Sequence, residues 1–202
     1  MKIFCVGRNY AEHAKELNNA IPENPLIFMK PPTALLKDDK PFYYPNFSND
    51  IHYEVEVVIK ISKNGKKIDA KFAHKYYNEF TLGIDFTARD IQSQLKEKGH
   101  PWEIAKGFDS SAVIGTFLNK KDYDLENLTF SLLKNNEVVQ KGNTKQMIYN
   151  IDTIISYISN YYMLQTGDLI YTGTPKGVGA VSIGNKLIGK IEEKEIFYTE
   201  IK

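Results

Sequence analysis

The segment 51–59, Ile-His-Tyr-Glu-Val-Glu-Val-Val-Ile, has the two-residue period of a β-strand. This period places Glu54 and Glu56 on one face of the strand, together with His52, and apolar side chains on the other face. Two neighbouring carboxylates repel each other, and burying both is costly unless a cation compensates their charge. The pair is therefore either a solvated stripe on the protein surface or part of a site for a divalent metal ion.

Strand-like segments dominate the rest of the chain, which contains 13 Tyr and 11 Phe besides many Val and Ile. Asn135 and Asn136 predict a hairpin turn, because Asn tolerates a positive φ. We expect strands at 2–6, 26–30, 41–44, 52–62, 80–86, 111–117, 128–133, 137–141, 168–172, 186–191 and 195–201.

Helical patterns are fewer. A start at Asn9 that resembles a capping box predicts a helix over 11–18. The composition of 89–98 predicts a second helix, and isoleucines at helical spacing predict a third over 151–159. Many short strands with few helices predict a β-rich α+β fold, unlike the alternating strands and helices of a nucleotide-binding fold.

The composition is that of an ordinary globular protein. The 202 residues contain no repeat and no flexible linker, so we expect a single domain over 1–202. A net charge of +1 offers no strong field to nucleic acid or to an anionic membrane. The single cysteine, Cys5, excludes an internal disulfide and fits a reducing compartment. No apolar run approaches the roughly 20 residues of a membrane span, and the start lacks a signal peptide, so we expect a cytoplasmic protein with no membrane partner.

Asp85 lies in an apolar, strand-like stretch just before a predicted helix, a position where Asp is disfavoured. It could cap that helix or pair with Arg89, or it could be a third oxygen ligand beside Glu54 and Glu56. Three carboxylates without cysteine suit a hard cation, Mg²⁺, Mn²⁺ or Ca²⁺. His52 is a geometric candidate, but we leave it outside the ligand set, because a histidine flanking a strand edge is more often solvated or hydrogen-bonded.

His13 and Glu16 are three residues apart on the first predicted helix, and therefore neighbours on one of its faces. A carboxylate beside an imidazole orients the ring and suits a general base that activates water, although surface helices carry such pairs routinely. Lys30 and Lys106 are lone cations in apolar surroundings. Each either extends to the surface or binds a substrate carboxylate.

The segment 172–179, Thr-Gly-Thr-Pro-Lys-Gly-Val-Gly, follows a predicted strand. It lacks the Gly-Lys-Ser/Thr of a phosphate-binding P-loop. Its glycines and hydroxyl groups could still form an anion-binding nest of backbone N–H groups, or the segment could be a tight structural turn.

Taken together and in order, these motifs resemble the fumarylacetoacetate hydrolase family. The similarity runs from about residue 3 to the C-terminus, and it is closest to the small acylpyruvate hydrolase and oxaloacetate decarboxylase branch. The blocks that carry it are Gly7-Arg8-Asn9-Tyr10 with His13 and Glu16, Phe28-Met29-Lys30-Pro31, Glu54-x-Glu56, Gly83-x-Asp85-x-Thr87-x-Arg89-Asp90, Lys106-Gly-Phe and the segment 172–179.

The resemblance implies the mixed β-roll fold of the family's C-terminal domain, usually as a homodimer. It also implies Mg²⁺ or Mn²⁺ held by Glu54, Glu56 and Asp85. The family's catalytic dyad falls on His13 and Glu16, on a segment that orders as a lid in that family. Its active-site lysine falls on Lys106, and the candidate substrate-binding residues are Arg8, Lys30, Arg89, Gln92 and Thr174.

The implied activity is cleavage of a C–C bond in acylpyruvates, with decarboxylation or tautomerisation of oxaloacetate as related reactions on a small 2-oxo acid. Stabilisation of an enolate by the metal is common to all of them. One alternative is isomerisation or hydration of the 2-hydroxy-dienoates formed in aromatic degradation. The other is a binding module with a structural ion, which would have no need of the acid–base pair His13 and Glu16.

Overall fold

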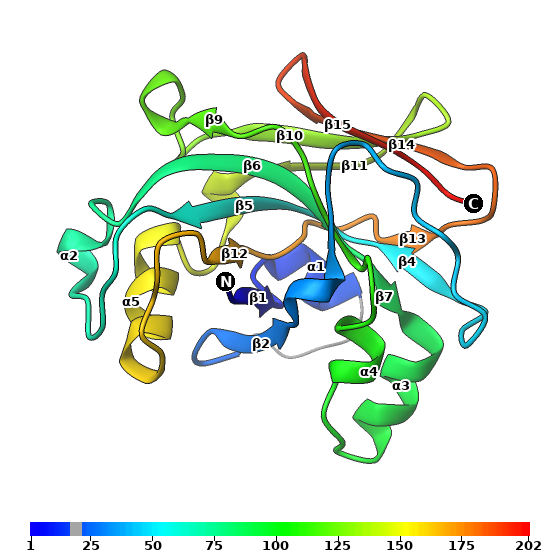
Figure 1. The fold of residues 1–202 in the computed structure, drawn as a ribbon, viewed down its shortest axis with the longest axis horizontal. Coiled ribbons are helices and arrows are strands. Elements are labelled where there is room, and N and C mark those ends of the chain that lie inside the picture. The colour runs from blue at the N-terminus through cyan, green and yellow to red at the C-terminus, as the bar shows by residue number, and fades with distance from the viewer. Residues whose placement is uncertain (17–21) are drawn as a thin grey trace.

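The computed structural model describes residues 1–16 and 22–202 as a β-rich arrangement of three sheets with short helices around them (Figure 1). The largest sheet has the order β2-β1-β12-β5-β6-β8-β3, and β9 pairs with β6. Pairs β1–β12 and β3–β8 are parallel and the others are antiparallel, so the sheet is mixed. Its strands are β1 (Ile3–Gly7), β2 (Leu26–Lys30), β3 (Leu35–Leu36), β5 (Val55–Ile61), β6 (Tyr77–Asp85), β8 (Ala112–Ile114), β9 (Leu118–Asn119) and β12 (Leu169–Tyr171).

Two smaller sheets complete the fold. A four-stranded sheet with the order β11-β10-β14-β15 lies over the long strands β5 and β6 (Figure 1), and a three-stranded sheet has the order β13-β4-β7. These strands are β4 (Ile51–Tyr53), β7 (Thr87–Ala88), β10 (Thr129–Lys134), β11 (Glu137–Asn143), β13 (Gly179–Ala180), β14 (Lys186–Ile191) and β15 (Lys194–Glu200).

Helices α2 and α5 lie side by side on one side of the molecule, and α3 and α4 lie side by side on another (Figure 1). Within the described part of the chain, no helix is both long enough and apolar enough to cross a membrane. The α-helices are α1 (Ala11–Glu16), α2 (Ala70–Ala73), α3 (Arg89–Glu97), α4 (Glu103–Lys106) and α5 (Ile151–Tyr161), and the 3₁₀ helices cover Pro32–Ala34, Lys120–Asp122 and Thr144–Gln146.

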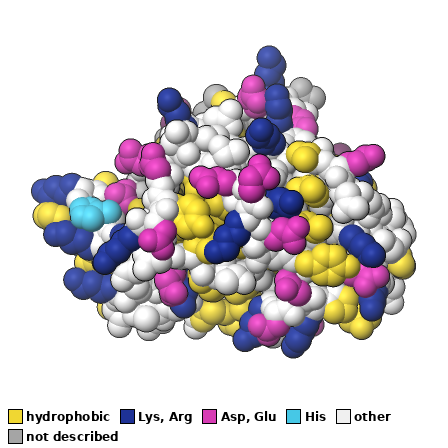
Figure 2. Space-filling model, turned by 90° about the horizontal axis from the view of Figure 1, so that it is seen from above, with side chains coloured by type: hydrophobic (Ala, Val, Ile, Leu, Met, Phe, Trp, Pro, Cys, Tyr) yellow, Lys and Arg dark blue, Asp and Glu magenta, His cyan; other side chains and the backbone are white. Residues whose placement is uncertain are grey.

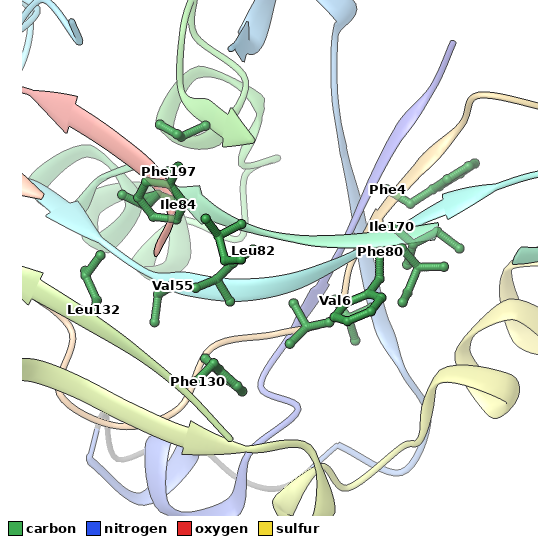
Figure 3. Close-up of a cluster of buried hydrophobic side chains, with 14 of the residues drawn as sticks. Phe4, Val6, Val55, Phe80, Leu82, Ile84, Phe130, Leu132, Ile170 and Phe197 are labelled. Carbon is green, nitrogen blue, oxygen red and sulfur yellow. The ribbon is translucent and has the colours of Figure 1, made fainter. Parts of the chain in front are cut away.

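The main core fills the space between the largest sheet and the four-stranded sheet. One cluster of buried side chains contains Leu82 and Ile84 of β6, Phe197 of β15 and Leu132 of β10 (Figure 3). All of these side chains are at most 3% exposed. Burial of this apolar surface is the main stabilising contribution, and it fixes the positions of β5 and β6, which carry the acidic residues.

The long strand predicted over 52–62 is interrupted. The chain leaves the three-stranded sheet after β4 and enters the largest sheet at β5, so Glu54 lies at the change of partners. The backbone N–H of Val55 donates to the side chain of Gln140 at 2.9 Å instead of to a neighbouring strand. The prediction of a regular strand over 41–44 is wrong. Phe42 forms only an isolated bridge with Ile201, and neither Pro41 nor Pro45 has an N–H to donate.

The helices at 89–98 and 151–159 are confirmed, with α3 ending before Gly99 at a φ of 64°. The hairpin turn is confirmed as well, since Asn135 and Asn136 have φ values of 52° and 70°. The start of the first helix is different from the prediction. The side chain of Asn9 does not cap α1, but bonds to backbone groups of Tyr149 and Thr172. Residues 17 and 18, the predicted end of that helix, lie outside the described residues.

Candidate active site

A cavity opens where β1, the start of β5, the end of β6, α3 and α4 converge. Three apolar or aromatic side chains, Val6, Phe28 and Trp102, form part of its wall. Most of the predicted site residues line it as well, namely Arg8, His13, Glu54, Glu56, Asp85, Arg89, Gln92, Lys106 and Thr174. The fold therefore brings together residues that are far apart in the sequence.

The three carboxylates form a compact, buried cluster. One oxygen from each of Glu54, Glu56 and Asp85 lies within 4.8 Å of the others, and the residues are 5%, 2% and 1% exposed. The pairing of β5 with β6 produces this cluster, because the N–H of Asp85 donates to the carbonyl of Glu54 at 2.8 Å. The interpretation of the glutamates as a solvated surface stripe is therefore wrong.

Lys106 provides a cation that touches two of the three carboxylates. Its ammonium group donates to Oε2 of Glu54 at 2.8 Å and to Oδ2 of Asp85 at 2.7 Å. Burial lowers the pKa of Lys106, but Asp85 and Glu54 raise it more, so that it stays above the usual value and the side chain stays charged. Burial likewise raises the pKa of Glu54, but Lys106 and Arg89 together hold it well below the usual range.

Within the described residues, no lysine or arginine forms an ion pair with Glu56. Burial raises its pKa well above the usual range, and the charges of Asp85 and Glu54 raise it further. The backbone N–H of Gly173 donates to Oε2 of Glu56 at 2.7 Å and lowers the pKa only in part. Glu56 is thus the carboxylate of the cluster that a bound cation would compensate most directly. The oxygen-only donors of the cluster fit a hard divalent cation such as Mg²⁺ or Mn²⁺.

Lys30 lies behind the cluster and does not line the cavity. It is 1% exposed, and its ammonium group lies 2.7 Å from Oδ1 of Asp85. It also donates to Oγ of Ser111 at 2.9 Å and to the carbonyls of Phe86, Lys106 and Ser111. An ammonium group has three hydrogens, and these partners occupy them. Lys30 is therefore placed to fix Asp85 rather than to reach a substrate. The two alternative roles considered for Asp85 are not observed. The N-cap of α3 is Ala88, and Arg89 pairs with Glu54 instead of Asp85.

His13 and Glu16 form the predicted pair. Nδ1 of His13 lies 3.2 Å from Oε2 of Glu16, and His13 is buried and lines the cavity. Glu16 lies outside the lining, where its Oε1 accepts a hydrogen bond from the N–H of Gly177 at 3.0 Å. With Nδ1 occupied by Glu16, Nε2 is the nitrogen of His13 that can exchange a proton with a molecule in the cavity.

Two backbone N–H groups of the segment 172–179 donate to acidic side chains. Gly173 donates to Glu56, and Gly177 donates to Glu16. Gly173 has a φ of 102°, and a Cβ there would lie 2.7 Å from Cβ of Asn9. The segment therefore binds anionic groups as a nest would, but these groups are side chains of the same protein.

The hydroxyl of Thr174 donates to the carbonyl of Val55 at 2.8 Å and accepts from Nε2 of Gln140 at 2.9 Å. Sequence reasoning missed Gln140, a buried residue that joins the segment 172–179 to the start of β5. The only sign of it in the sequence was a polar residue within the strand predicted over 137–141.

Arg89 bonds to a carboxylate oxygen of Glu54 and to Oε1 of Gln92. His52 is paired with Asp50 at 2.9 Å and does not line the cavity, in agreement with its exclusion from the ligand set.

Sequence reasoning also missed Lys96, Phe28 and Trp102. Trp102 stacks edge-on against Phe28 with ring centroids 5.9 Å apart, and the ammonium of Lys96 lies 5.4 Å from the Trp102 ring. That Trp102 is the only tryptophan of the chain could have drawn attention to it.

Comparison with known proteins places these residues in a wider context. Residues 2–198 match the family described as Fumarylacetoacetate (FAA) hydrolase C-terminal. Among curated proteins, "Oxaloacetate decarboxylase, mitochondrial" of Dictyostelium discoideum is 48% identical over 185 residues, which cover 91% of this chain and 85% of that protein. "Oxaloacetate tautomerase FAHD1, mitochondrial" of Arabidopsis thaliana is 42% identical over 191 residues, which cover 94% of this chain and 86% of that one.

Solved structures show the same architecture. A fumarylpyruvate hydrolase from Pseudomonas aeruginosa, in complex with Mn²⁺ and pyruvate, superposes with a TM-score of 0.93 at 35% identity, covering 100% of this chain and 89% of that chain. A 2-hydroxyhepta-2,4-diene-1,7-dioate isomerase from Mycobacterium marinum superposes with a TM-score of 0.86 at 33% identity, covering 99% of this chain and 73% of that chain.

Proposed function

This chain belongs to the fumarylacetoacetate hydrolase family, and we propose that it is a divalent-metal-dependent enzyme that acts on small 2-oxo acids. The reaction we propose is cleavage of a C–C bond in acylpyruvates, with decarboxylation or tautomerisation of oxaloacetate at the same site. The observation that carries this proposal is the buried carboxylate cluster facing the pair His13 and Glu16 in one cavity.

Glu54, Glu56 and Asp85 would hold Mg²⁺ or Mn²⁺. When bound, a divalent cation supplies Lewis acidity, which draws electron density from the 2-oxo group and favours negative charge on the neighbouring carbon. The protein holds its own cations beside this point. Lys106 touches Glu54 and Asp85 and lines the cavity, so its ammonium group can donate to an oxygen that gains negative charge.

For an acylpyruvate, His13 would take a proton from a water molecule while Glu16 holds the imidazole ring in place. The resulting hydroxide then adds to the distal carbonyl, and the C–C bond breaks to release a carboxylic acid and the enolate of pyruvate, which takes up the proton from His13 to give pyruvate.

For oxaloacetate the same enolate forms by loss of CO₂ and needs no attacking water. Tautomerisation needs only transfer of a proton between carbon and oxygen. The names of the relatives from D. discoideum and A. thaliana support these two reactions.

A second candidate function is isomerisation of 2-hydroxy-dienoates, which is favoured by the likeness to the isomerase from M. marinum. It would use the same carboxylates and the same proton acceptor on a longer substrate. The predicted homodimer and the predicted cytoplasmic location stay predictions, and both relatives described above are named mitochondrial.

The test is a comparison of substrates. Release of pyruvate from acetylpyruvate and from oxaloacetate is measured with Mn²⁺, with Mg²⁺, and in EDTA followed by readdition of Mn²⁺. We expect release that EDTA abolishes and Mn²⁺ restores, and the ratio of the two rates ranks hydrolysis against decarboxylation. Absence of release from both acids, together with turnover of a 2-hydroxy-dienoate, would replace the proposal with the isomerase function.

A further inference from the structure

The four-stranded sheet supports the active-site cavity from outside its lining. Of the described residues that line the cavity, none belongs to β10, β11, β14 or β15. β11 nevertheless lies at one edge of that sheet and contacts the segment 172–179 closely. A Cβ at Gly177 would lie 2.5 Å from the carbonyl oxygen of Val139, and a Cβ at Gly142 would lie 2.9 Å from Cγ of Pro175. The segment 172–179 therefore packs directly on β11.

A β-bulge on β11 buries one polar side chain at this contact. Leu132 of β10 pairs with Gln140 and Leu133 pairs with Val138, which makes Val139 an extra residue on β11. In a regular strand Val138 and Gln140 would share a face, but Val138 is 60% exposed and Gln140 is 2% exposed. A bulge redirects the side chains next to it. The bulge at Val139 thus turns the amide of Gln140 into the interior.

The amide of Gln140 joins two segments that are far apart in the sequence. Its Oε1 accepts from the backbone N–H of Val55 at 2.9 Å. Its Nε2 donates to the hydroxyl of Thr174 at 2.9 Å and to the carbonyl of Pro175 at 3.0 Å. Because an N–H can only donate and a carbonyl can only accept, these partners require a side chain with one accepting end and one donating end. A carboxylate or an aliphatic chain of the same length would lack the donors.

The first of these contacts holds the backbone that carries two of the three carboxylates. Val55 lies between Glu54 and Glu56, at the point where the chain passes from the three-stranded sheet to the largest sheet. Its N–H bonds to Gln140 at this change of sheets. The bond therefore fixes the backbone from which both glutamates project.

The other contacts hold the segment 172–179 between its two donors to acidic side chains. Gly173 and Gly177 lie on either side of the two residues that Gln140 contacts. Gly173 donates to Glu56 of the carboxylate cluster, and Gly177 donates to Glu16 of the catalytic pair. One buried amide thus supports both halves of the site.

We propose that Gln140 is a positioning residue for the metal site and for the pair His13 and Glu16. It holds the start of β5 and the segment 172–179 in one arrangement, which orients Glu56 for a divalent cation and Glu16 for the imidazole ring. It acts through these groups, because it does not itself line the cavity. The inference rests on the proposed function, since it assumes that the carboxylate cluster binds the metal ion.

The variant that tests this role is Gln140→Met, which keeps the length of the side chain and removes the amide. Binding of Mn²⁺ is measured by isothermal titration calorimetry, well below the unfolding midpoint. We expect the dissociation constant to rise by about tenfold or more, the lower end of the loss seen when a partner of a metal ligand is removed. Partial unfolding would instead lower the stoichiometry of binding and leave the dissociation constant unchanged.

A second readout concerns the catalytic pair. Displacement of Glu16 disturbs the orientation of His13, which cleavage of acetylpyruvate requires and decarboxylation of oxaloacetate does not. At saturating Mn²⁺, Gln140→Met should therefore lower kcat for acetylpyruvate more than kcat for oxaloacetate. An equal fall of both values would overturn the positioning of the catalytic pair by Gln140.

Two further variants complete the test. Ser159 of α5 is a buried residue outside the cavity lining, and its hydroxyl accepts from the backbone N–H of Ile68 at 2.8 Å. Ser159→Ala removes a comparable buried bond, and it should lower the unfolding midpoint without changing the dissociation constant of Mn²⁺. Gln140→Asn keeps a buried amide that is one methylene too short to join both segments. If Gln140→Met does not fold, Gln140→Asn replaces it, and we expect it to bind Mn²⁺ more weakly than the wild-type protein.

The outcomes separate this role from the proposed function. Wild-type affinity for Mn²⁺ in the folded variant of Gln140 would overturn the positioning role and leave the proposed function intact. An equal loss of affinity in Ser159→Ala would overturn it as well, because any buried hydrogen bond would then have the same effect. Absence of Mn²⁺ binding by the wild-type protein contradicts the proposed metal site itself, and the positioning role falls with it.

Discussion

At the scale of single residues, the three carboxylates of the cluster are not equivalent. Glu54 touches Lys106 and Arg89, and Asp85 touches Lys30 and Lys106, whereas Glu56 receives a hydrogen bond from a backbone N–H. Glu56 is therefore the carboxylate whose charge depends most on a bound cation. Replacing it tests the metal site more directly than replacing either of the others, because its loss leaves no buried lysine or arginine without its partner.

His13, the proposed proton acceptor, provides a second test at the scale of single residues. His13→Ala should lower the rate of acylpyruvate cleavage by about 10²–10⁴-fold, the usual contribution of a general base. Decarboxylation of oxaloacetate needs no attacking water and should fall less. Both rates are measured at saturating Mn²⁺, and Lys15→Ala, on an exposed position of the same helix, is the matched control. Unchanged cleavage in His13→Ala would show that another group activates the water.

The positions of some of these side chains could be predicted from the sequence, whereas those of others could not, for physical reasons. Two glutamates separated by one residue in a strand share a face whatever the fold, so their proximity was predictable. Whether Lys30 points to a substrate or to Asp85 depends on which segments pack behind it, which local periodicity does not show. Lys96 was missed for a similar reason, because only the packing of α4 beside α3 brings Trp102 against it.

At the scale of elements, the site depends on how closely β5, β6 and β8 approach one another. Gly83 of β6 lies opposite Glu56 of β5 and Ile114 of β8. A Cβ at Gly83 would lie 2.3 Å from the carbonyl oxygen of Val113 and 3.0 Å from the ring of Tyr171. Because these neighbours are backbone or part of the core, they cannot give way without moving a strand.

Gly83→Ala should therefore lower the free energy of unfolding by about 3 kcal/mol or more, at the upper end of the cost of overpacking. Urea denaturation measures this change. Gly99→Ala is the comparison. Among the described residues no atom lies within 4 Å of a Cβ at Gly99, so this substitution costs only the backbone strain of a φ of 64°. A cost at Gly83 no greater than the cost at Gly99 would contradict the close packing described here.

The strand predictions show what element-scale sequence reasoning can and cannot give. The strand-like residue pattern located β5 and most of β6, which were predicted over 52–62 and 80–86. It did not show that the chain changes sheets at Glu54, since β4 and β5 form one continuous pattern and differ only in their partners. The short helix α4, which carries Lys106, was missed because four residues are too few for a periodicity.

At the scale of the whole molecule, acidic and basic side chains are interspersed over most of the face seen in Figure 2, in keeping with the net charge of +1. The buried cluster is different, because its negative charges are concentrated in the interior between β5 and β6. A cation that binds there interacts with the folded protein only, and so it stabilises the fold as a whole.

We expect thermal unfolding in a single transition, as for one domain, with a midpoint that rises on addition of Mn²⁺. At a Mn²⁺ concentration 100 times its dissociation constant, the stabilisation should be about 2.7 kcal/mol. For a protein of this size, that corresponds to a rise of roughly 5–11 °C. Ca²⁺ at the same excess over its own dissociation constant is a useful comparison. An unchanged midpoint with Mn²⁺ would mean that the cluster does not bind it in the folded state.

The central claim is that the buried carboxylate cluster is the catalytic metal site, and Glu56→Gln tests it most directly. Glutamine keeps the size of the side chain and an oxygen that can accept from Gly173, but removes the charge. Mn²⁺ binding by calorimetry and pyruvate release are measured on the same samples during titration with Mn²⁺. In the wild-type protein, occupancy and activity should rise together to one ion per chain. In Glu56→Gln, the affinity for Mn²⁺ should fall by more than about 100-fold, beyond the loss typical of a residue that only supports a ligand, and activity should fall with it. Tight Mn²⁺ binding and full activity in Glu56→Gln would contradict the account.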